Sequence, residues 1–164
     1  MASLSGSALF GRDFDSLETG RPLLSRGRTI TEADLVGFSA LTGDWHPAHS
    51  DAVWAAGSEF GERVAHGLLV LSFAVGLVDY DSDWVMALRR VSRATFKAPV
   101  KIGDTIRVEV SVGSTRPLDA RAGLVETRWR VLNQHEKAVA VFSIELIWRR
   151  AGVRPAAEAR SAVG

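Results

Sequence analysis

The order of hydrophobic and polar residues predicts helices in the first half of the chain. Leu35, Phe38 and Leu41 recur at helical spacing. The segment begins at Thr31, a residue type that caps helix N-termini, and acidic residues follow in the first turn. Because the apolar spacing ends at Gly43, we predict a short helix between Thr31 and Gly43.

Two further helical segments follow. Residues 51–56 favour one helical turn, and the glycine-containing residues 57–63 are typical of a connection. The segment from His66 to Val78 is apolar on all sides, which predicts a helix that is buried on every side. It is well short of the roughly 20 residues that a bilayer-spanning helix needs.

From Trp84 onward the period changes to two residues. Apolar and polar residues alternate in residues 106–112, 125–131 and 142–146, and turn residues lie at 102–104, 116–119 and 133–136. This pattern predicts antiparallel strands with one buried face. A sheet that curls around the apolar helix would bury the apolar face of the strands and the helix together, so we predict an α+β fold.

Composition narrows the class of protein. The 164 residues suffice for one domain, and 20 basic against 19 acidic residues give no sign of a nucleic-acid partner. Cysteine is absent, which excludes disulfides, thiolate nucleophiles and cysteine-ligated zinc. The N-terminus lacks the features of a secretory signal. We expect a soluble cytoplasmic protein without membrane contacts, with one domain at 1–150 and a flexible tail at 151–164.

Acidic residues and histidines are clustered in the stretch GDWHPAHSD, residues 43–51. Asp44, His46, His49 and Asp51 are all ligand types for a metal, but the spacing lacks a pair of histidines on one helix face. A turn capped by Asp44, with exposed histidines, is the ordinary structural alternative. We expect this stretch to be a loop that brings Asp44 and His49 together and points His46 elsewhere.

A carboxylate and an imidazole that share one water can exchange its proton, which is what adding water to a polarised double bond requires. Downstream, His66 and Gly67 begin the apolar helix, where backbone N–H groups lack helical partners. The N–H of Gly67 could therefore stabilise a thioester oxygen as negative charge develops on it.

Three motifs occur in order: TGDWHPAHSD, VAHGLL and FKAPVKIGDTI. Over residues 31–148 the chain resembles the MaoC-like dehydratases, also called R-specific enoyl-CoA hydratases. The resemblance implies a hotdog fold, in which a curled antiparallel sheet wraps around one long buried helix, and a homodimer. It also implies reversible hydration of a 2-enoyl thioester, carried by CoA or a carrier protein, to the R-3-hydroxyacyl thioester. Asp44 and His49 would be the catalytic pair and Gly67 the oxyanion donor, with no cofactor and no metal.

Other residues are candidates for substrate binding: Trp45, His46, His66, Phe96 and Pro99. The family most often has Asn where this chain has His46. An imidazole can still donate one hydrogen bond there, although it is larger and titrates near neutrality. His66 is more typical of a helix-start residue bonded to the backbone than of a base. The basic residues between Arg89 and Lys101 could meet the carrier's phosphates or form a solvated strand face.

Two other functions fit the same fold. Hotdog thioesterases usually place a carboxylate on the long helix, where this chain has none before Asp79. A non-catalytic acyl-binding subunit of a heteromeric dehydratase would not need both Asp44 and His49.

Overall fold

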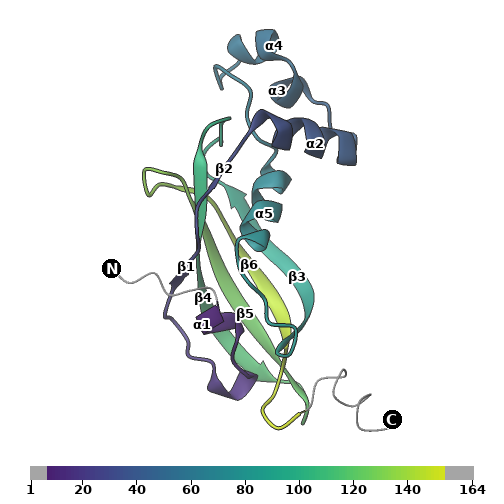
Figure 1. Cartoon of the computed structure of the whole chain (residues 1–164), viewed down its shortest axis with the longest axis vertical. Helices are drawn as coiled ribbons and strands as arrows, with labels where there is room; N and C mark the ends of the chain where they lie inside the picture. The colour runs from purple at the N-terminus through teal and green to yellow at the C-terminus, as the bar shows by residue number, and fades with distance from the viewer. Residues whose placement is uncertain (1–6, 154–164) are drawn as a thin grey trace.

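A computed structural model describes residues 7–153 of the chain. Its largest element is an antiparallel sheet with the strand order β1-β4-β5-β6-β3, and β2 pairs with β4 outside this order (Figure 1). The strands are β1 (Leu23–Leu24), β2 (Arg28–Thr29), β3 (Val85–Phe96), β4 (Thr105–Pro117), β5 (Ala122–Leu132) and β6 (Ala138–Arg149). The predicted antiparallel strands are therefore confirmed, and the predicted turns separate them.

The described helices are short, and all of them precede the long strands β3 to β6. They are α1 (Ser7–Phe10), the 3₁₀ turn η1 (Phe14–Ser16), α2 (Glu32–Thr42), α3 (Pro47–Ser50), α4 (Ala52–Ala56) and α5 (Gly67–Gly76). Figure 1 shows α5 lying along the sheet, with α2, α3 and α4 gathered beyond one end of it. The chain thus carries the residues between 43 and 51 to the end of the sheet where α5 begins.

Local interactions explain where α2 begins and ends. The Thr31 side chain accepts a hydrogen bond from the Asp34 N–H, and the Asp34 carboxylate accepts one from the Thr31 N–H, which is a capping box. The helix ends at Gly43, whose φ of 79° lies in the left-handed region that favours glycine. The predicted helix is confirmed, although Leu41 is 82% exposed and does not contribute to its buried face.

The expectation that the apolar helix is buried on every side is wrong. Leu69, Val70, Leu71 and Ala74 of α5 are buried. Leu68 is 66% exposed, and Ser72 and Gly76 are exposed too. These three residues are spaced by four and so form one stripe. A single sheet covers only one side of α5, so an apolar sequence alone does not tell which side is covered.

The core lies between α5 and the inner face of the sheet. Ile106, Val108, Val110 and Val112 of β4 are at most 1% exposed, which confirms the predicted alternation. Thr127 is fully buried among apolar residues on β5, where its hydroxyl donates to the Ile144 carbonyl and accepts from Trp129. Its polar group is therefore satisfied inside the core.

Two expectations concern the ends of the chain and the membrane. Of the predicted tail at 151–164, residues 154–164 lie outside the described residues. Within residues 7–153, no helix has the length and hydrophobicity that crossing a membrane would require.

Candidate active site

A cavity of about 580 Å³ opens where α2, α3 and the start of α5 meet the end of β3. Asp44, His49, His66 and Gly67 all line it. Most of the other lining residues are apolar and include Phe38, Phe60, Val70, Phe96, Pro99 and Val139. The volume is in the range of small-molecule sites, and the polar groups converge at one place in an apolar wall.

The backbone on both sides of Asp44 fixes the direction of its carboxylate. The Thr42 hydroxyl accepts a hydrogen bond from the Asp44 N–H at 3.3 Å, and Thr42 itself donates to the Phe38 carbonyl at the end of α2. One carboxylate oxygen, Oδ1, accepts the His46 N–H at 3.2 Å. Among residues 7–153, no backbone N–H bonds the second carboxylate oxygen, which leaves it for a ligand in the cavity.

His49 is held by the carbonyl of Val64. Its Nδ1 lies 2.7 Å from the Val64 oxygen. A carbonyl only accepts hydrogen bonds, so Nδ1 carries the proton in this contact and Nε2 is the free nitrogen. Neutral His49 thus offers a lone pair at Nε2, which can accept a proton.

The expectation that both reactive side chains lie on a loop is wrong for His49. Residues Pro47–Ser50 form the single helical turn α3, which contains His49, whereas Asp44 stays in the preceding loop. Proline occupies the first turn, where its missing N–H costs no hydrogen bond. The predicted turn after it is confirmed as α4, which Asp51 caps through the N–H groups of Val53 and Trp54.

His46 caps α3, which accounts for an imidazole at this position. Its Nδ1 accepts a hydrogen bond from the Ala48 N–H at 3.2 Å. Its ring also packs edge-on against Trp54, with centroids 5.6 Å apart. At Nδ1 the ring accepts a hydrogen bond, as an asparagine side chain at a helix N-cap would, and Nε2 remains the nitrogen that can donate one.

The start of α5 faces the cavity without a side-chain cap. His66 occupies the N-cap position and gives no side-chain hydrogen bond to the first turn. The first N–H groups of a helix have no partner within it, and the helix dipole is positive at this end. The N–H groups at Gly67 can therefore receive a partly negative oxygen.

Burial lowers the pKa of His49 from its ordinary value of 6.5. The hydrogen bond to Val64 and the charge of Asp44 raise the pKa, but they do not cancel the effect of burial. His49 is therefore held in its neutral form at neutral pH. This is the form whose Nε2 accepts a proton.

Distances alone would let a metal approach this site. Asp44, His49 and His66 each offer one ligand atom, and these atoms lie within 4.8 Å of one another. His66 Nε2, however, already lies within hydrogen-bonding distance of both Ser39 and the Asp44 carbonyl, and His49 Nδ1 is bonded to Val64. A metal would have to compete with these bonds, so we assign none, and its absence stays a prediction.

The predicted substrate-binding residues divide into two groups. His66, Phe96 and Pro99 line the cavity. Trp45 and His46 are not among its lining residues, and Trp45 is 53% exposed. A role for these two in substrate binding therefore stays a prediction without support from the cavity.

Sequence reasoning missed the residues that hold the reactive groups. The Val64 carbonyl could not be found from residue types, because any residue carries one. Ser39 did carry a signal, since it lies four residues after Leu35 on the buried face of α2. A small polar residue on a buried helix face needs a partner, which here is His66.

The basic stretch before Lys101 mostly pairs with acidic residues of the sheet. Arg89 and Arg90 both pair with Glu145, and Arg93 pairs with Glu126. These exposed ion pairs agree with a solvated strand face at the three arginines. Lys97 differs from them because it lines the cavity.

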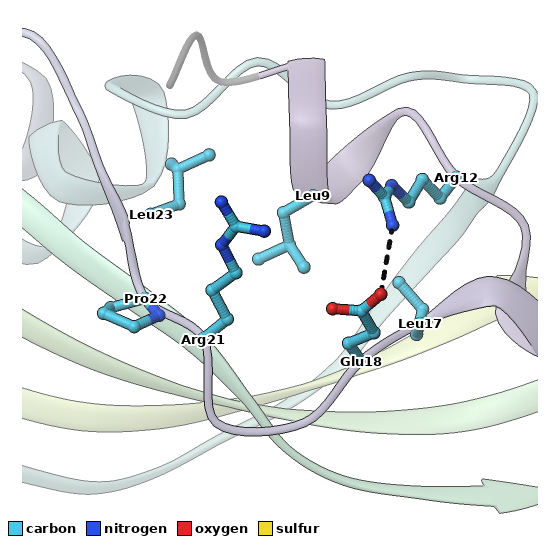
Figure 2. A pocket seen from close by; sticks show the side chains of 7 residues that line it. All are labelled: Leu9, Arg12, Leu17, Glu18, Arg21, Pro22 and Leu23. Carbon is cyan, nitrogen blue, oxygen red and sulfur yellow. Dashed lines mark ion pairs between the residues drawn. The ribbon is translucent and has the colours of Figure 1, made fainter. Parts of the chain in front are cut away.

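A second hollow lies near the N-terminal segment and is much smaller, at about 80 Å³ (Figure 2). It is lined by Leu9, Arg12, Leu17, Glu18, Arg21, Pro22 and Leu23. Its one ion pair, Arg12 with Glu18 at 3.8 Å, is exposed, and no histidine lies there. We therefore place the candidate active site in the larger cavity.

Comparison with known proteins places the chain among hydratases and dehydratases. The family model for the MaoC like domain matches residues 14–134. Protein MaoC of Klebsiella aerogenes is 45% identical over 103 residues, which cover 62% of this chain and 31% of that protein. A 3-hydroxybutyryl-CoA dehydratase of Methylorubrum extorquens is 34% identical over 114 residues, 70% of this chain and 72% of that protein. A 3-hydroxybutyryl-CoA dehydratase is a hydro-lyase.

Solved structures agree with the fold. R-hydratase PhaJ1 of Pseudomonas aeruginosa, in its unliganded form, superposes with a TM-score of 0.68 and 28% identity over 87% of this chain and 94% of that one. A Mycobacterium tuberculosis protein with a double hotdog fold superposes with a TM-score of 0.74 and 21% identity over 88% of this chain and 46% of that one. The predicted α+β hotdog fold is thus confirmed.

Proposed function

This chain belongs to the MaoC-like domain family, and we propose that it is a hydro-lyase acting on acyl thioesters. The reaction is the reversible addition of water to a trans-2-enoyl thioester, which gives the R-3-hydroxyacyl thioester. The observation that carries the proposal is the convergence of Asp44, His49 and the start of α5 on one largely apolar cavity. The names of the related hydratases and dehydratases support the same reaction.

Asp44 and His49 are suited to hold one water between two acceptors. The free Asp44 oxygen accepts one of its protons, and His49 Nε2 accepts the other because Nδ1 is engaged by Val64. A water that donates both protons turns its oxygen lone pairs toward the substrate. The pair therefore aims the nucleophilic oxygen at C3 of the enoyl group.

This arrangement also determines the source of the proton that is added to C2. Asp44 and His49 both act as hydrogen-bond acceptors before the reaction, so neither has a proton of its own to give. As the water oxygen bonds to C3, one O–H bond breaks, and the pair passes this proton to C2. Both parts of one water enter the product, and we treat Asp44 and His49 as one coupled unit.

The start of α5 stabilises the intermediate charge. Attack at C3 moves electrons toward the thioester oxygen, which becomes enolate-like. The Gly67 N–H and the positive end of the α5 dipole are placed to receive this oxygen. No electron is lost or gained in the reaction, so it requires no redox cofactor.

The carrier of the acyl group is CoA or a carrier protein. Both bear a phosphorylated pantetheine arm, so the same cationic residue can serve either. Lys97, the residue directly after β3, lines the cavity. We place the phosphate-bearing arm on the Lys97 side of the cavity, with the acyl chain against the apolar lining.

Neither alternative function gains support from the site. Helix α5 has no carboxylate between Gly67 and Gly76 that could serve a hotdog thioesterase. A non-catalytic acyl-binding subunit would need the cavity, but it would have no use for an acid and a neutral imidazole aimed at the same point.

The active form is a homodimer in this proposal. Within the part of the chain that the structure describes, strand β3 pairs only with β6, and nearly all of its residues are exposed. Met86, Leu88 and Val91 on this strand are between 44% and 50% exposed. A long edge strand with apolar side chains is rarely left exposed to solvent, so we expect a second copy of the chain to pack against it.

Incubating the purified protein with crotonyl-CoA tests the function. We expect the absorbance of the conjugated enoyl thioester to fall and R-3-hydroxybutyryl-CoA to form, with no free thiol. Release of free CoA would instead identify a thioesterase. If neither product forms with crotonyl-CoA or with longer enoyl-CoA and enoyl-carrier substrates, the proposal fails.

A further inference from the structure

We propose that His66 is a positioning residue that holds Asp44 and His49 in the geometry required for catalysis. This inference rests on the proposed function, and it gives His66 a role beyond lining the cavity. His66 is 2% exposed, so its position cannot be explained by contact with solvent. Its ring touches both members of the reactive pair, and it lies immediately before the oxyanion donor.

The first contact anchors the backbone of Asp44. His66 Nε2 lies 3.1 Å from the Asp44 carbonyl oxygen and 3.1 Å from the Ser39 hydroxyl oxygen. The carbonyl can only accept, so Nε2 carries a proton and donates it. Buried hydrogen bonds of this kind are costly to leave unmade. The bond therefore keeps the Asp44 loop against the start of α5.

The second contact supports the ring of His49. The His49 and His66 rings stack with centroids 3.7 Å apart and planes inclined by 28°. Phe38 packs against His66 with centroids 5.0 Å apart. His49 is thus held at Nδ1 by Val64 and across one ring face by His66, so its Nε2 has a defined direction.

The hydrogen bonds of His66 do not suit it to transfer protons itself. Nε2 is engaged by two oxygens, whereas Nδ1 has no hydrogen-bond partner among the residues that the structure describes. Nδ1 therefore has no described protein group with which to exchange a proton, and the two bonds of Nε2 suit the ring to holding its neighbours.

His66 joins α2 and the loop after it to the start of α5, more than 20 residues later in the sequence. Ser39 belongs to α2, Asp44 to the following loop, and Gly67 to α5. If the ring is lost, the carboxylate, the imidazole and the oxyanion donor are no longer tied together. A displacement of the order of 1 Å can lower a rate by about a hundredfold.

Two substitutions separate positioning from simple packing. H66L keeps the bulk of the side chain but removes the donor, whereas H66Q places an amide N–H near the position of Nε2. We expect H66L to lower kcat by roughly 10- to 100-fold with KM changed by less than about threefold. H66Q should recover kcat to within about fivefold of the parent. The substitution H135L, at an exposed histidine in the turn between β5 and β6, is the matched control.

NMR of the imidazole nitrogens gives a readout that does not depend on turnover. In the parent we expect His49 to carry its proton on Nδ1 and His66 on Nε2. Because the Val64 carbonyl sets the His49 tautomer, the readout of its position is the sharpness of the His49 ring signals. These signals should be single and sharp in the parent, and broadened or doubled in H66L, where the stacked ring is gone. If H66L fails to fold, H66N replaces it, because its shorter amide does not reach the Asp44 carbonyl.

Two results would overturn the proposal: an H66L or H66N protein with kcat within twofold of the parent, or His49 ring signals in that protein as single and sharp as in the parent. An H66Q protein as slow as H66L would do the same. If the parent itself does not hydrate crotonyl-CoA, the proposed function fails, and the NMR comparison still decides whether His66 positions His49.

Discussion

The ring of Phe96 lies directly over Gly67. A Cβ atom on this glycine would stand 2.7 Å from Cζ of Phe96 and under 3.0 Å from two more ring atoms. A side chain added at Gly67 would therefore first displace Phe96, which is 50% exposed and lines the same cavity.

We predict that Gly67→Val abolishes turnover in a folded protein, because the added side chain pushes the Phe96 ring into the thioester site. The loss should appear in kcat at least as much as in KM, since the hydrogen bond strengthens as charge develops on the oxygen. Steady-state kinetics with crotonyl-CoA and a thermal melt measure both effects.

Gly76→Val is the matched control for this substitution. Gly76 lies at the other end of α5, and a Cβ there meets no atom within 4 Å. It should keep most of the activity. A folded Gly67→Val protein that works within about tenfold of the parent would place the thioester elsewhere.

The pH profile of hydration should report the neutral form of His49. Burial lowers the pKa of His49 below its ordinary 6.5, so the imidazole stays neutral until the pH falls below that value. Under the proposed mechanism only neutral His49 accepts the water proton. The rate should therefore fall about tenfold per pH unit on the acid side, through a pKa below 6.5.

The dependence of kcat/KM on pH measures this limb for the free enzyme. A limb that lies at or above pH 6.5, or one that persists in His49→Ala, would show that another group controls the rate.

His46 should be replaceable by a residue that can cap α3. His46→Asn keeps a side-chain acceptor for the Ala48 N–H, whereas His46→Ala removes it. We expect His46→Asn to retain the stability of the parent. His46→Ala should lose about 1 kcal/mol of unfolding free energy, which is typical for an N-cap, and some activity because α3 carries His49.

Urea unfolding of the two variants tests this account of His46. Equal stability of His46→Asn and His46→Ala would mean that the cap contributes nothing, and that the position of His46 requires another reason.

The exposed edge of β3 predicts a homodimer. Leu88→Arg places a charge among the exposed apolar residues of this strand and should weaken self-association. Light scattering at micromolar concentration should give twice the chain mass for the parent and a lower mass for Leu88→Arg. A parent that is a monomer would contradict the prediction.

Much of the fold was predictable because its signals are local. The capping box at Thr31 and the alternation along β4 each depend on neighbouring residues and both appear in the structure. The single turn α3 was missed because one turn has no period to detect. The exposed stripe at Leu68 was missed because an apolar sequence does not state what covers it.

The site was predictable only in part, for a related reason. Asp44 and His49 are close in sequence, so their motif is visible. The contact of His66 with Ser39 joins residues 27 positions apart, and Val64 acts through its backbone. Such support depends on tertiary packing, which the residue types alone do not reveal.

The hydration rate of four variants tests the central claim most directly. The set is Asp44→Asn, His49→Ala, the double mutant and the control Asp51→Asn. Asp51 caps α4 and does not line the cavity, and asparagine can cap in its place, so this control should match the parent. Each single change at the reactive pair should lower kcat by roughly 10²- to 10⁴-fold with little loss of stability. Because both residues act on one water, the double mutant should be scarcely slower than the slower single mutant. Near-parent turnover in folded Asp44→Asn or His49→Ala, measured with crotonyl-CoA, would contradict this assignment of the active site.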